Sequence, residues 1–303
     1  MRALVTGSGG FVGPHLTAHL RDEGDEVLTP THAGCDVDIR DLDALVAAFD
    51  RAEAEVVYHL AGASDVGGSW KDPSTTFRVN AEGTLNVLTA ARRTGVRRVL
   101  TVGSADVYGK VGLDELPITE ASELRPTSPY AASKVAADYV AVQAGLGYDQ
   151  DVIRVRAFNH LGPGQRPSFV APAIATRIAA NERDGSDVVP IGNLSSRRDF
   201  TDVRDVVAAY RLLMLRGEAG AVYNVCSGVD VSVQELADRL ISMATRPMRL
   251  EVDPSLFRPV DIPVLRGDRT KVSSATGWAP TVPLDRTLSD LLAACRNQVA
   301  DGA

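Results

Sequence analysis

Cysteine and aromatic residues are scarce in this sequence of 303 residues. Aromatic side chains make up 5% of the chain, and there are three cysteines, Cys35, Cys226 and Cys295, which are far apart and include no CxxC pair. An odd number of widely spaced cysteines argues against a disulfide framework or a cysteine-based zinc site, and it fits a reducing compartment. We therefore expect buried thiols.

Long apolar runs and blocks of basic residues are also missing. No stretch reaches the roughly 18 apolar residues of a membrane span, and Arg2 leads directly into a strand-like segment rather than a signal peptide. The 32 basic and 39 acidic residues give a net charge of −7 without a basic cluster. This balance argues against a nucleic-acid or anionic-membrane partner, and we expect a cytoplasmic protein.

Short apolar segments alternate with helical patterns in the first half of the chain. They are rich in valine or leucine and lack strict alternation, as expected of parallel strands covered on both faces. The candidate strands are 2–7, 26–30, 54–62, 97–104 and 151–158. Helical spacing is found at 42–49, 73–93 and 130–144.

This alternation predicts an α/β fold with a Rossmann-type, doubly wound parallel sheet. The interval from Pro30 to Cys35 is too short for a helical crossover, so one early helix is expected to be missing or reduced.

After Asn159 the chain becomes rich in proline and glycine, which indicates a smaller α/β substrate-binding lobe. A helix over 202–214 and a strand over 220–228 are expected to return to the first domain. The first predicted domain, with the Rossmann-type sheet, is 1–158 and 203–228, and the predicted smaller lobe is 159–202 and 229–303. Further helices are expected near 173–181, after the capping-box pair Ser232 and Glu235, and over 283–295.

A glycine motif lies between the first predicted strand and the first helix. The segment VTGSGGFVG places Gly7, Gly10 and Gly13 where a tight turn and a helix N-terminus can hold a pyrophosphate. In this context the motif predicts dinucleotide binding. The second strand ends without the acidic residue or arginine that usually distinguishes the 2′-hydroxyl of NAD from the 2′-phosphate of NADP. The sequence therefore does not decide between the two cofactors. Asp38 is a candidate adenine contact or, alternatively, a capping acid before Leu42.

Three polar side chains are candidates for the chemistry. Tyr130 and Lys134 share one face of a predicted helix, and Ser104 ends the strand 97–104, beyond which ligands bind in open α/β sheets. A phenol, an ammonium and a hydroxyl at one site suit proton exchange during hydride transfer at a carbonyl. We expect the Lys134 ammonium and a nicotinamide cation to favour the phenolate and lower the pKa of Tyr130 by a few units, and Lys134 to reach the nicotinamide ribose. The alternative is an exposed pair without function.

Further motifs accompany these residues: HLAGA at 59–63, NAEGT at 80–84, GSADVYG at 103–109 and YAASK at 130–134. With them the chain resembles the extended short-chain dehydrogenase/reductase family over essentially its whole length. The resemblance implies a Ser104, Tyr130 and Lys134 triad, reduced NADP or NAD as co-substrate, and a homodimer formed through a two-helix face. The implied dinucleotide contacts are Gly7, Gly10, Phe11, Val12, Gly13, Asp38, Ile39, Leu60, Ala61, Ala63, Tyr130 and Lys134.

The second half of the chain is similar to enzymes of GDP-6-deoxyhexose metabolism in RAFNHLGPGQ, IGNLSSRRDFTDVRDVV, NVCSG and RPVDIPVLRGD. This similarity implies a nucleotide-sugar substrate, with a GDP-linked one favoured. The implied substrate contacts are Ser104, Asn159, Val170, Asn193, Arg198, Arg258 and Asp261. Arginine suits a diphosphate because its planar fork forms paired hydrogen bonds, although either arginine could instead form a surface ion pair.

The implied reaction is the NAD(P)H-dependent reduction of the 4-keto group of GDP-4-keto-6-deoxy-D-mannose to GDP-D-rhamnose. An alternative is a nucleotide-sugar 4,6-dehydratase or 4-epimerase. Dehydratases of the family carry a carboxylate, usually Glu, two residues after the catalytic Ser or Thr, and this chain has the shorter Asp106 there. A non-catalytic dinucleotide-sensing regulator is a third class, but such proteins typically lack the tyrosine or the lysine.

Other residues are expected to be structural. His15 and His19 are four residues apart, but no third ligand accompanies them, so we expect no metal site. We expect His59 to be structural at a strand end, and Trp70 and Trp278 to lie in the core.

Overall fold

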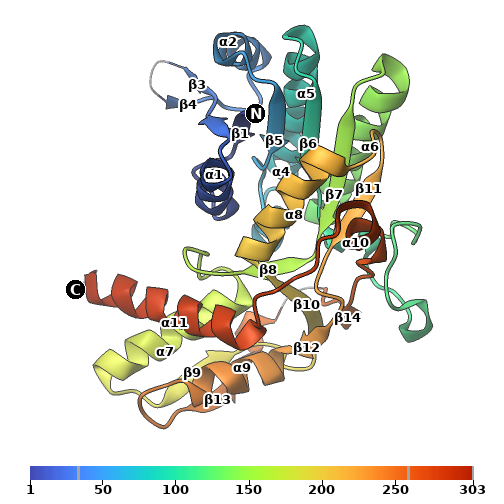
Figure 1. Ribbon diagram of the computed structural model, residues 1–303. Coiled ribbons are helices and arrows are strands. Elements are labelled where there is room, and N and C mark those ends of the chain that lie inside the picture. The colour runs from blue at the N-terminus through green and yellow to red at the C-terminus, as the bar shows by residue number, and fades with distance from the viewer. Residues whose placement is uncertain (33–34, 258–259, 302–303) are drawn as a thin grey trace.

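The computed structural model describes residues 1–32, 35–257 and 260–301. Figure 1 shows an upper lobe built around a central sheet and a lower lobe that contains α7 (Val170–Asp184), α9 (Val233–Ser242) and the C-terminal α11 (Leu284–Asp301). The N-terminus starts the first strand of the upper lobe.

Six strands form the central sheet in the order β11-β7-β6-β5-β1-β2, and every neighbouring pair is parallel. The strands are β1 (Arg2–Thr6), β2 (Glu26–Leu28), β5 (Val56–His59), β6 (Arg98–Val102), β7 (Val152–Ala157) and β11 (Val222–Val225). They lie at the predicted strand positions. The strand predicted over 220–228 is β11, and it joins the first sheet as predicted. The predicted doubly wound α/β fold is confirmed.

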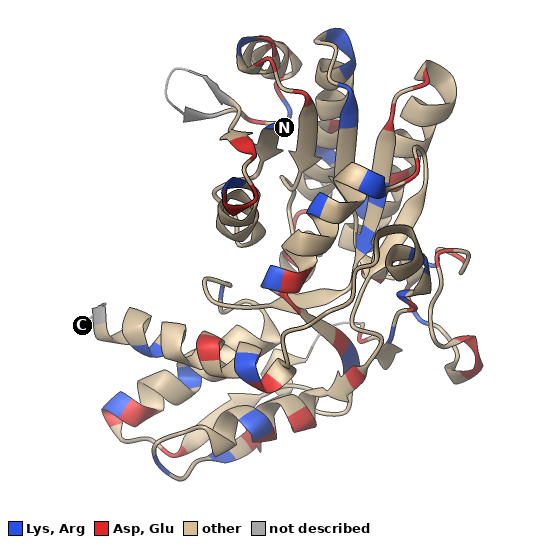
Figure 2. Cartoon of the chain, viewed as in Figure 1, with Lys and Arg blue, Asp and Glu red and all other residues tan. Residues whose placement is uncertain are grey.

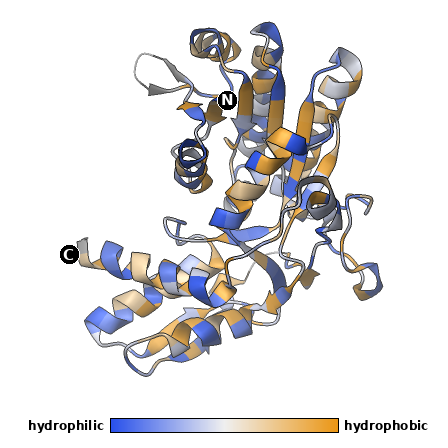
Figure 3. Ribbon diagram, in the orientation of Figure 1, coloured by the Kyte–Doolittle hydropathy of each residue, from blue (hydrophilic) through white to orange (hydrophobic). Residues whose placement is uncertain are grey.

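Helices cover both faces of this sheet. On one face, Leu16 of α1 (Val12–Asp22) and Leu213 of α8 (Val203–Arg216) belong to one core cluster. On the other, α2 (Leu42–Ala52), α5 (Gly83–Arg93) and α6 (Pro129–Tyr148) supply a second cluster. The strands between them are mainly apolar, as Figure 3 shows, because both of their faces are covered.

The early crossover differs from a regular one, as predicted. In place of a helix after β2, the described residues form the short strands β3 (Thr31–His32) and β4 (Cys35–Asp36), and α2 then leads to β5. The helical region predicted over 73–93 is also divided. It consists of α4 (Pro73–Phe77), a π-helical segment (Arg78–Glu82) and α5.

The lower lobe is built from small sheets and three helices. The antiparallel β10–β12 pair and the parallel β10–β14 and β10–β8 pairs form one sheet, and β9 pairs with β13. The strands are β8 (Asn159–Leu161), β9 (Val188–Ile191), β10 (Arg197–Asp202), β12 (Asp230–Ser232), β13 (Arg249–Val252) and β14 (Val264–Leu265). The predicted helices are present as α7, α9 and α11, and the Ser232–Glu235 capping box begins α9.

The two lobes share chain segments at their boundary. Strand β10 of the lower lobe continues directly into α8 of the upper lobe. Helix α10 (Thr270–Thr276) contributes Val272 to the core of the upper lobe, and the buried Trp278 joins the same cluster. The exact division at 158, 203 and 228 therefore stays a prediction.

The remaining observations concern the thiols and the surface. Cys226 and Cys295 are free and buried, while the side chain of Cys35 lies outside the described part of the structure. Figure 2 shows acidic and basic residues interspersed over both lobes. Within the described ranges, we find no helix whose length and apolarity would let it cross a membrane.

Asp199 joins the lower sheet to the end of β11. Its buried carboxylate accepts hydrogen bonds from the Ser227 backbone N–H (2.8 Å) and hydroxyl (2.6 Å) and from the N–H groups of Gly228 (2.9 Å) and Gly267 (3.2 Å). Burial nevertheless raises its pKa. Removing this acceptor would leave several buried donors unpaired, which is costly.

We predict that Asp199→Ala lowers the free energy of unfolding by at least about 2 kcal/mol, measured by urea denaturation. Asp184→Ala, which removes an exposed ion pair with Arg183, is the control and should leave the free energy of unfolding nearly unchanged. Equal losses in the two variants would contradict the structural role of Asp199.

Candidate active site

The glycine loop after β1 has the shape needed by a dinucleotide. Gly7 has a φ of +73°, and a Cβ at this position would lie 2.6 Å from the Ala61 backbone nitrogen. The Gly10 N–H donates to the Gly7 carbonyl at 3.0 Å, which closes the turn. No side chain caps the N-terminus of α1 at Phe11, so this helix end can receive an anion. The loop therefore fits the pyrophosphate of NAD or NADP.

His59 fixes the strand ends beside this loop. Its Nδ1 shares a hydrogen bond of 2.8 Å with the Thr6 hydroxyl, and its Nε2 shares one of 3.1 Å with the Thr84 hydroxyl. Burial lowers the pKa of His59 to about 3, and the charge of Lys134 acts in the same direction. The ring is neutral at physiological pH, which agrees with the structural role expected of His59.

Ser104, Tyr130 and Lys134 line one cavity of about 280 Å³ together with the glycine loop. Ser104 follows the end of β6, and its Oγ accepts the Asp106 N–H at 3.2 Å. Tyr130 is the second residue of α6, which Ser128 caps, and Lys134 lies one turn later. The Lys134 Nζ donates to the Val102 carbonyl at 3.0 Å. The structure thus brings the three predicted side chains to one site. The alternative, that Tyr130 and Lys134 form an exposed pair without function, is wrong, because both line the cavity.

The pKa of Tyr130 differs from the sequence-based expectation. Burial raises it above the ordinary value near 10, and the charge of Asp106 adds to the increase, while a hydrogen bond with Ser104 acts in the opposite direction. Burial also lowers the pKa of Lys134 to about 8. The lowering expected from Lys134 is not seen, because desolvation disfavours the charged form of both groups, while the lowering expected from a nicotinamide cation stays a prediction. Tyr130 is protonated at neutral pH and can act as a proton donor.

Asn80 is a buried residue that supports the segments lining the catalytic cavity, and the sequence prediction did not include it. Its Oδ1 accepts the Ala63 N–H at 2.8 Å, and its Nδ2 donates to the Ala63 carbonyl (3.1 Å) and to the Ser133 hydroxyl (2.9 Å). It occupies the π-helical segment, a type of distortion that is frequent at functional sites. Asn80 is the first residue of the NAEGT motif, which the sequence analysis noted. The motif alone does not show which groups the Asn80 side chain contacts.

Most of the predicted dinucleotide contacts line the catalytic cavity: Gly7, Gly10, Phe11, Val12, Gly13, Leu60, Tyr130 and Lys134. The structure places Asp38, Ile39, Ala61 and Ala63 outside its lining. Asp38 forms an ion pair with Arg40, and the acid that caps α2 is Asp41. The alternative role of Asp38 as a helix cap is therefore wrong.

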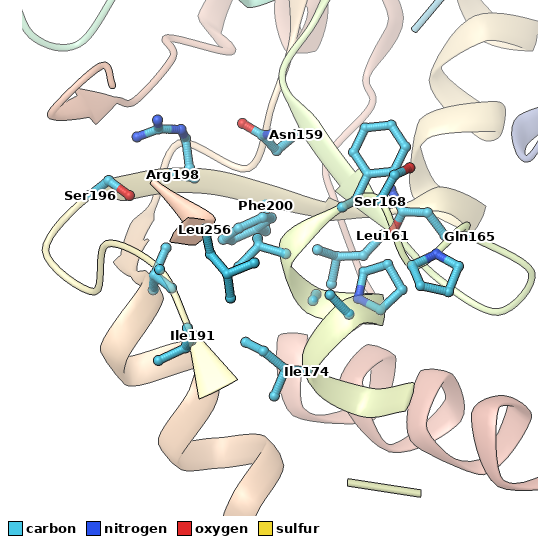
Figure 4. Close-up of a pocket in the computed structure, with 18 of the residues that line it drawn as sticks. Asn159, Leu161, Gln165, Ser168, Ile174, Ile191, Ser196, Arg198, Phe200 and Leu256 are labelled. Atoms are coloured by element: carbon cyan, nitrogen blue, oxygen red, sulfur yellow. The ribbon is translucent and has the colours of Figure 1, made fainter. Parts of the chain in front are cut away.

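A second cavity of about 270 Å³ adjoins the first in the lower lobe. Asn159, Gln165, Arg198 and Asp261 line both cavities, so the two form a continuous site between the lobes. Figure 4 shows Arg198 and Asn159 on one side of this second cavity and Ile174 and Ile191 on the opposite side, with Phe200 and Leu256 between them.

The predicted substrate residues gather at this second cavity. The Arg198 Nη2 donates to Asp261 Oδ1 at 2.9 Å, and the Asn193 Nδ2 donates to Asp261 Oδ2 at 2.5 Å. Val170 begins α7, and the N-cap residue Phe169 makes no side-chain cap hydrogen bond. Arg258 lies outside the described residues. Arg198 is thus held in a half-buried network at the cavity, rather than in an exposed surface pair.

An aromatic contact links the two lobes above the cofactor loop. The Phe11 ring stacks on His160 with centroids 5.9 Å apart and planes 8° apart. His15 Nε2 donates to the Pro163 carbonyl at 2.9 Å, which gives this histidine a structural contact. The loop after β8 is therefore packed against the first turn of α1.

The prediction for Trp70 is wrong. Its side chain is 41% exposed and lines the catalytic cavity, whereas Trp278 is 4% exposed and lies in the core as predicted. The cause is the short helix α3 (Val66–Ser69), which ends at the cavity edge immediately before Trp70.

Comparisons with known proteins agree with this geometry. A family model described as GDP-mannose 4,6 dehydratase matches residues 31–291. GDP-6-deoxy-D-mannose reductase of Pseudomonas aeruginosa is 36% identical, and the alignment covers 99% of each chain.

Two solved structures are also similar over the whole chain. RMD from Pseudomonas aeruginosa complexed with NADPH has a TM-score of 0.91 and 34% identity, covering 98% of this chain and 100% of that chain. UDP-glucose 4-epimerase from Thermus thermophilus in complex with NAD has a TM-score of 0.87 and 29% identity, covering 98% of this chain and 99% of that chain.

The lowered pKa of Lys134 generates a prediction about pH. Its ammonium loses the proton as the pH rises through about 8, so a contact to a nicotinamide ribose should weaken over that range. We expect the dissociation constant of NADPH to increase about tenfold or less between pH 7 and pH 9, because at most about 90% of the ammonium is lost one unit above the pKa. Titration of NADPH fluorescence measures this.

Lys134→Met should bind NADPH more weakly at pH 7 and should show a flat profile. The exposed Lys110→Met is the control and should keep the wild-type profile. A wild-type dissociation constant that does not vary over this pH range would remove Lys134 from cofactor binding.

Proposed function

Because this chain belongs to the GDP-mannose 4,6 dehydratase family of NAD(P)-dependent extended short-chain oxidoreductases, we propose that it reduces the keto group of a nucleotide sugar. The proposed substrate is GDP-4-keto-6-deoxy-D-mannose, the product is GDP-D-rhamnose, and the co-substrate is NADPH or NADH. The full-length similarity to a GDP-6-deoxy-D-mannose reductase supports this choice.

The observation that carries the proposal is the protonated phenol of Tyr130 beside Ser104 and Lys134. A bound reduced nicotinamide would supply the hydride for the keto carbon. Tyr130 would give its proton to the carbonyl oxygen, and Ser104 would hold that oxygen by a hydrogen bond. Because its pKa is raised, the phenol of Tyr130 is protonated before the reaction and so holds the proton that the reduction consumes. Lys134 would orient the ribose, and a proton from solvent would restore the phenol.

The second cavity is suited to the nucleotide part of the substrate. The uncapped N-terminus of α7 at Val170 offers N–H donors and positive potential to a diphosphate. Arg198 lies at the same cavity with its guanidinium fixed by Asp261 and by the Ile262 carbonyl (2.7 Å). Deeper in, the apolar side chains of Phe200 and Leu256 can cover a base. These features support Arg198, Asp261, Asn193 and Val170 as substrate contacts.

A dehydratase is the second candidate, and Asp106 is the observation that favours it. This carboxylate lines the catalytic cavity and is near enough to raise the pKa of Tyr130. A dehydratase needs a base at this place to remove the C5 proton. Aspartate is one methylene shorter than glutamate, and a displacement of about 1 Å can cost ~10²-fold in a positioned reaction. The shorter side chain favours the reductase.

We further propose a homodimer formed through a face of α5 and α6. Leu85, Tyr139 and Leu146 on these helices are exposed, with accessible fractions of 44%, 60% and 86%. Apolar side chains on two neighbouring helices are typical of a surface that a second copy covers.

Tyr130→Phe should reduce turnover by at least ~10²-fold, because only the proton donor is removed. The dissociation constant of NADPH should change little. Turnover is measured by NADPH oxidation with the keto sugar, and binding by fluorescence titration. A phenylalanine variant with a near-normal rate would exclude Tyr130 as the acid.

Stoichiometry separates the reductase from the dehydratase. With GDP-4-keto-6-deoxy-D-mannose, we predict that one NADPH or NADH is oxidised for each GDP-D-rhamnose formed, with the product identified by NMR. With GDP-mannose alone, we expect no 4-keto-6-deoxy product. Conversion of GDP-mannose without net cofactor consumption would refute the reductase and support the dehydratase.

A further inference from the structure

Trp70 places a large apolar side chain at the catalytic end of the site. It is 41% exposed and lines the cavity that contains Ser104 and Tyr130. The preceding residue, Ser69, is buried, and its Oγ accepts the Tyr130 backbone N–H at 3.2 Å. The indole is therefore adjacent in sequence to a residue that directly contacts the start of α6, close to the position proposed for the keto group.

Other apolar side chains line the same cavity. Val66 lies one helical turn before Trp70, and Val260 comes from the lower lobe with 43% of its surface exposed. Exposed aromatic and aliphatic surface is stabilised when hydrocarbon covers it. The hydroxyls of Ser64, Thr127 and Ser128 also line this cavity and can serve the hydroxyl groups of a sugar.

The proposed substrate offers one group that matches this apolar surface. Its base can be covered by Phe200 and Leu256 in the second cavity, and its diphosphate, ribose and sugar ring carry oxygen atoms throughout, while C6 of a 6-deoxy sugar is a methyl group. We infer that Trp70, together with Val66 and Val260, receives this C6 methyl group and selects 6-deoxy sugars against sugars with a C6 hydroxyl. This inference rests on the proposed function and assigns the sugar specificity of the same site.

The expected size of the selection follows from the chemistry. An apolar surface rejects a ligand that adds only a hydroxyl by no more than about 10²-fold, because the loss is the desolvation of one polar group. We therefore expect the site to prefer the deoxy sugar by ~10-fold to ~10²-fold. Without the indole, water can reach C6 and the preference should largely disappear.

The test compares GDP-D-rhamnose with GDP-D-mannose, which differ only in the C6 hydroxyl. Their dissociation constants are measured by calorimetry on the full chain saturated with NADP⁺. The wild type should prefer GDP-D-rhamnose by at least ~10-fold, and Trp70→Ala should reduce this preference to about threefold or less. Trp70→Phe should keep most of it, since an aromatic face remains. The affinity for NADP⁺ should be unchanged in both variants.

A second measurement uses the fact that the chain has only two tryptophans. Trp278 is buried in the core of the upper lobe, so a change in tryptophan emission on adding GDP-D-rhamnose should come from Trp70. We expect this change in the wild type and not in Trp70→Phe. Leu113→Ala is the control for an exposed apolar residue away from both cavities, and it should behave as the wild type.

A wild type without sugar preference, or a preference that survives in Trp70→Ala, would overturn the inference. The outcome for the proposed reaction is separate. If the keto sugar is not reduced but the Trp70-dependent preference is present, only the reductase proposal fails. If reduction is normal and the preference does not depend on Trp70, only this inference fails. Failure to bind either nucleotide sugar would overturn both.

Discussion

Parallel pairing of β1, β5 and β6 is the constraint on which the site depends. Their register aligns Thr6 with His59 and His59 with Thr101, so the three strands end at one level of the sheet. The glycine loop leaves β1 at this edge and Ser104 leaves β6 there. The His59 ring, bonded to Thr6 and Thr84, ties the edge to α5. A shift in register would separate the cofactor loop from the catalytic residues.

Burial at this edge then determines the protonation states. The same desolvation raises the pKa of Tyr130, lowers that of Lys134 to about 8 and lowers that of His59 to about 3. Each pKa unit corresponds to about 1.4 kcal/mol, so these are large effects on groups that share one edge of the sheet. The outcome is a neutral phenol and a neutral imidazole beside an ammonium that titrates near physiological pH. In this state the phenol of Tyr130 carries a proton, and Lys134 is the group of the three whose charge changes near physiological pH.

The lobes are joined so that the two halves of the site keep a fixed relation. β10 runs directly into α8, Asp199 binds the turn after β11, and Phe11 stacks on His160 above the cofactor loop. Arg198 and Asp261 line both cavities from the lower lobe. A nucleotide sugar bound along them would have its diphosphate in one lobe and its reacting carbon in the other. The apolar side chain of Trp70 lies at that second end.

The sequence by itself determined the parallel sheet, the glycine loop and the Ser104, Tyr130 and Lys134 constellation, because hydrophobic period and residue spacing are local properties. Tertiary structure decided the side-chain contacts, the burial and the pKa values, because these depend on residues that are distant in the sequence. Asn80 reaches Ala63 and Ser133 only after folding, and Asp38 pairs with Arg40 while Asp41 caps the helix. Trp70 faces a cavity rather than a core because its short helix ends at the cavity edge. The pKa of Tyr130 is raised although Lys134 lies one helical turn away, since desolvation is set by everything packed around a group and not by its spacing along the chain.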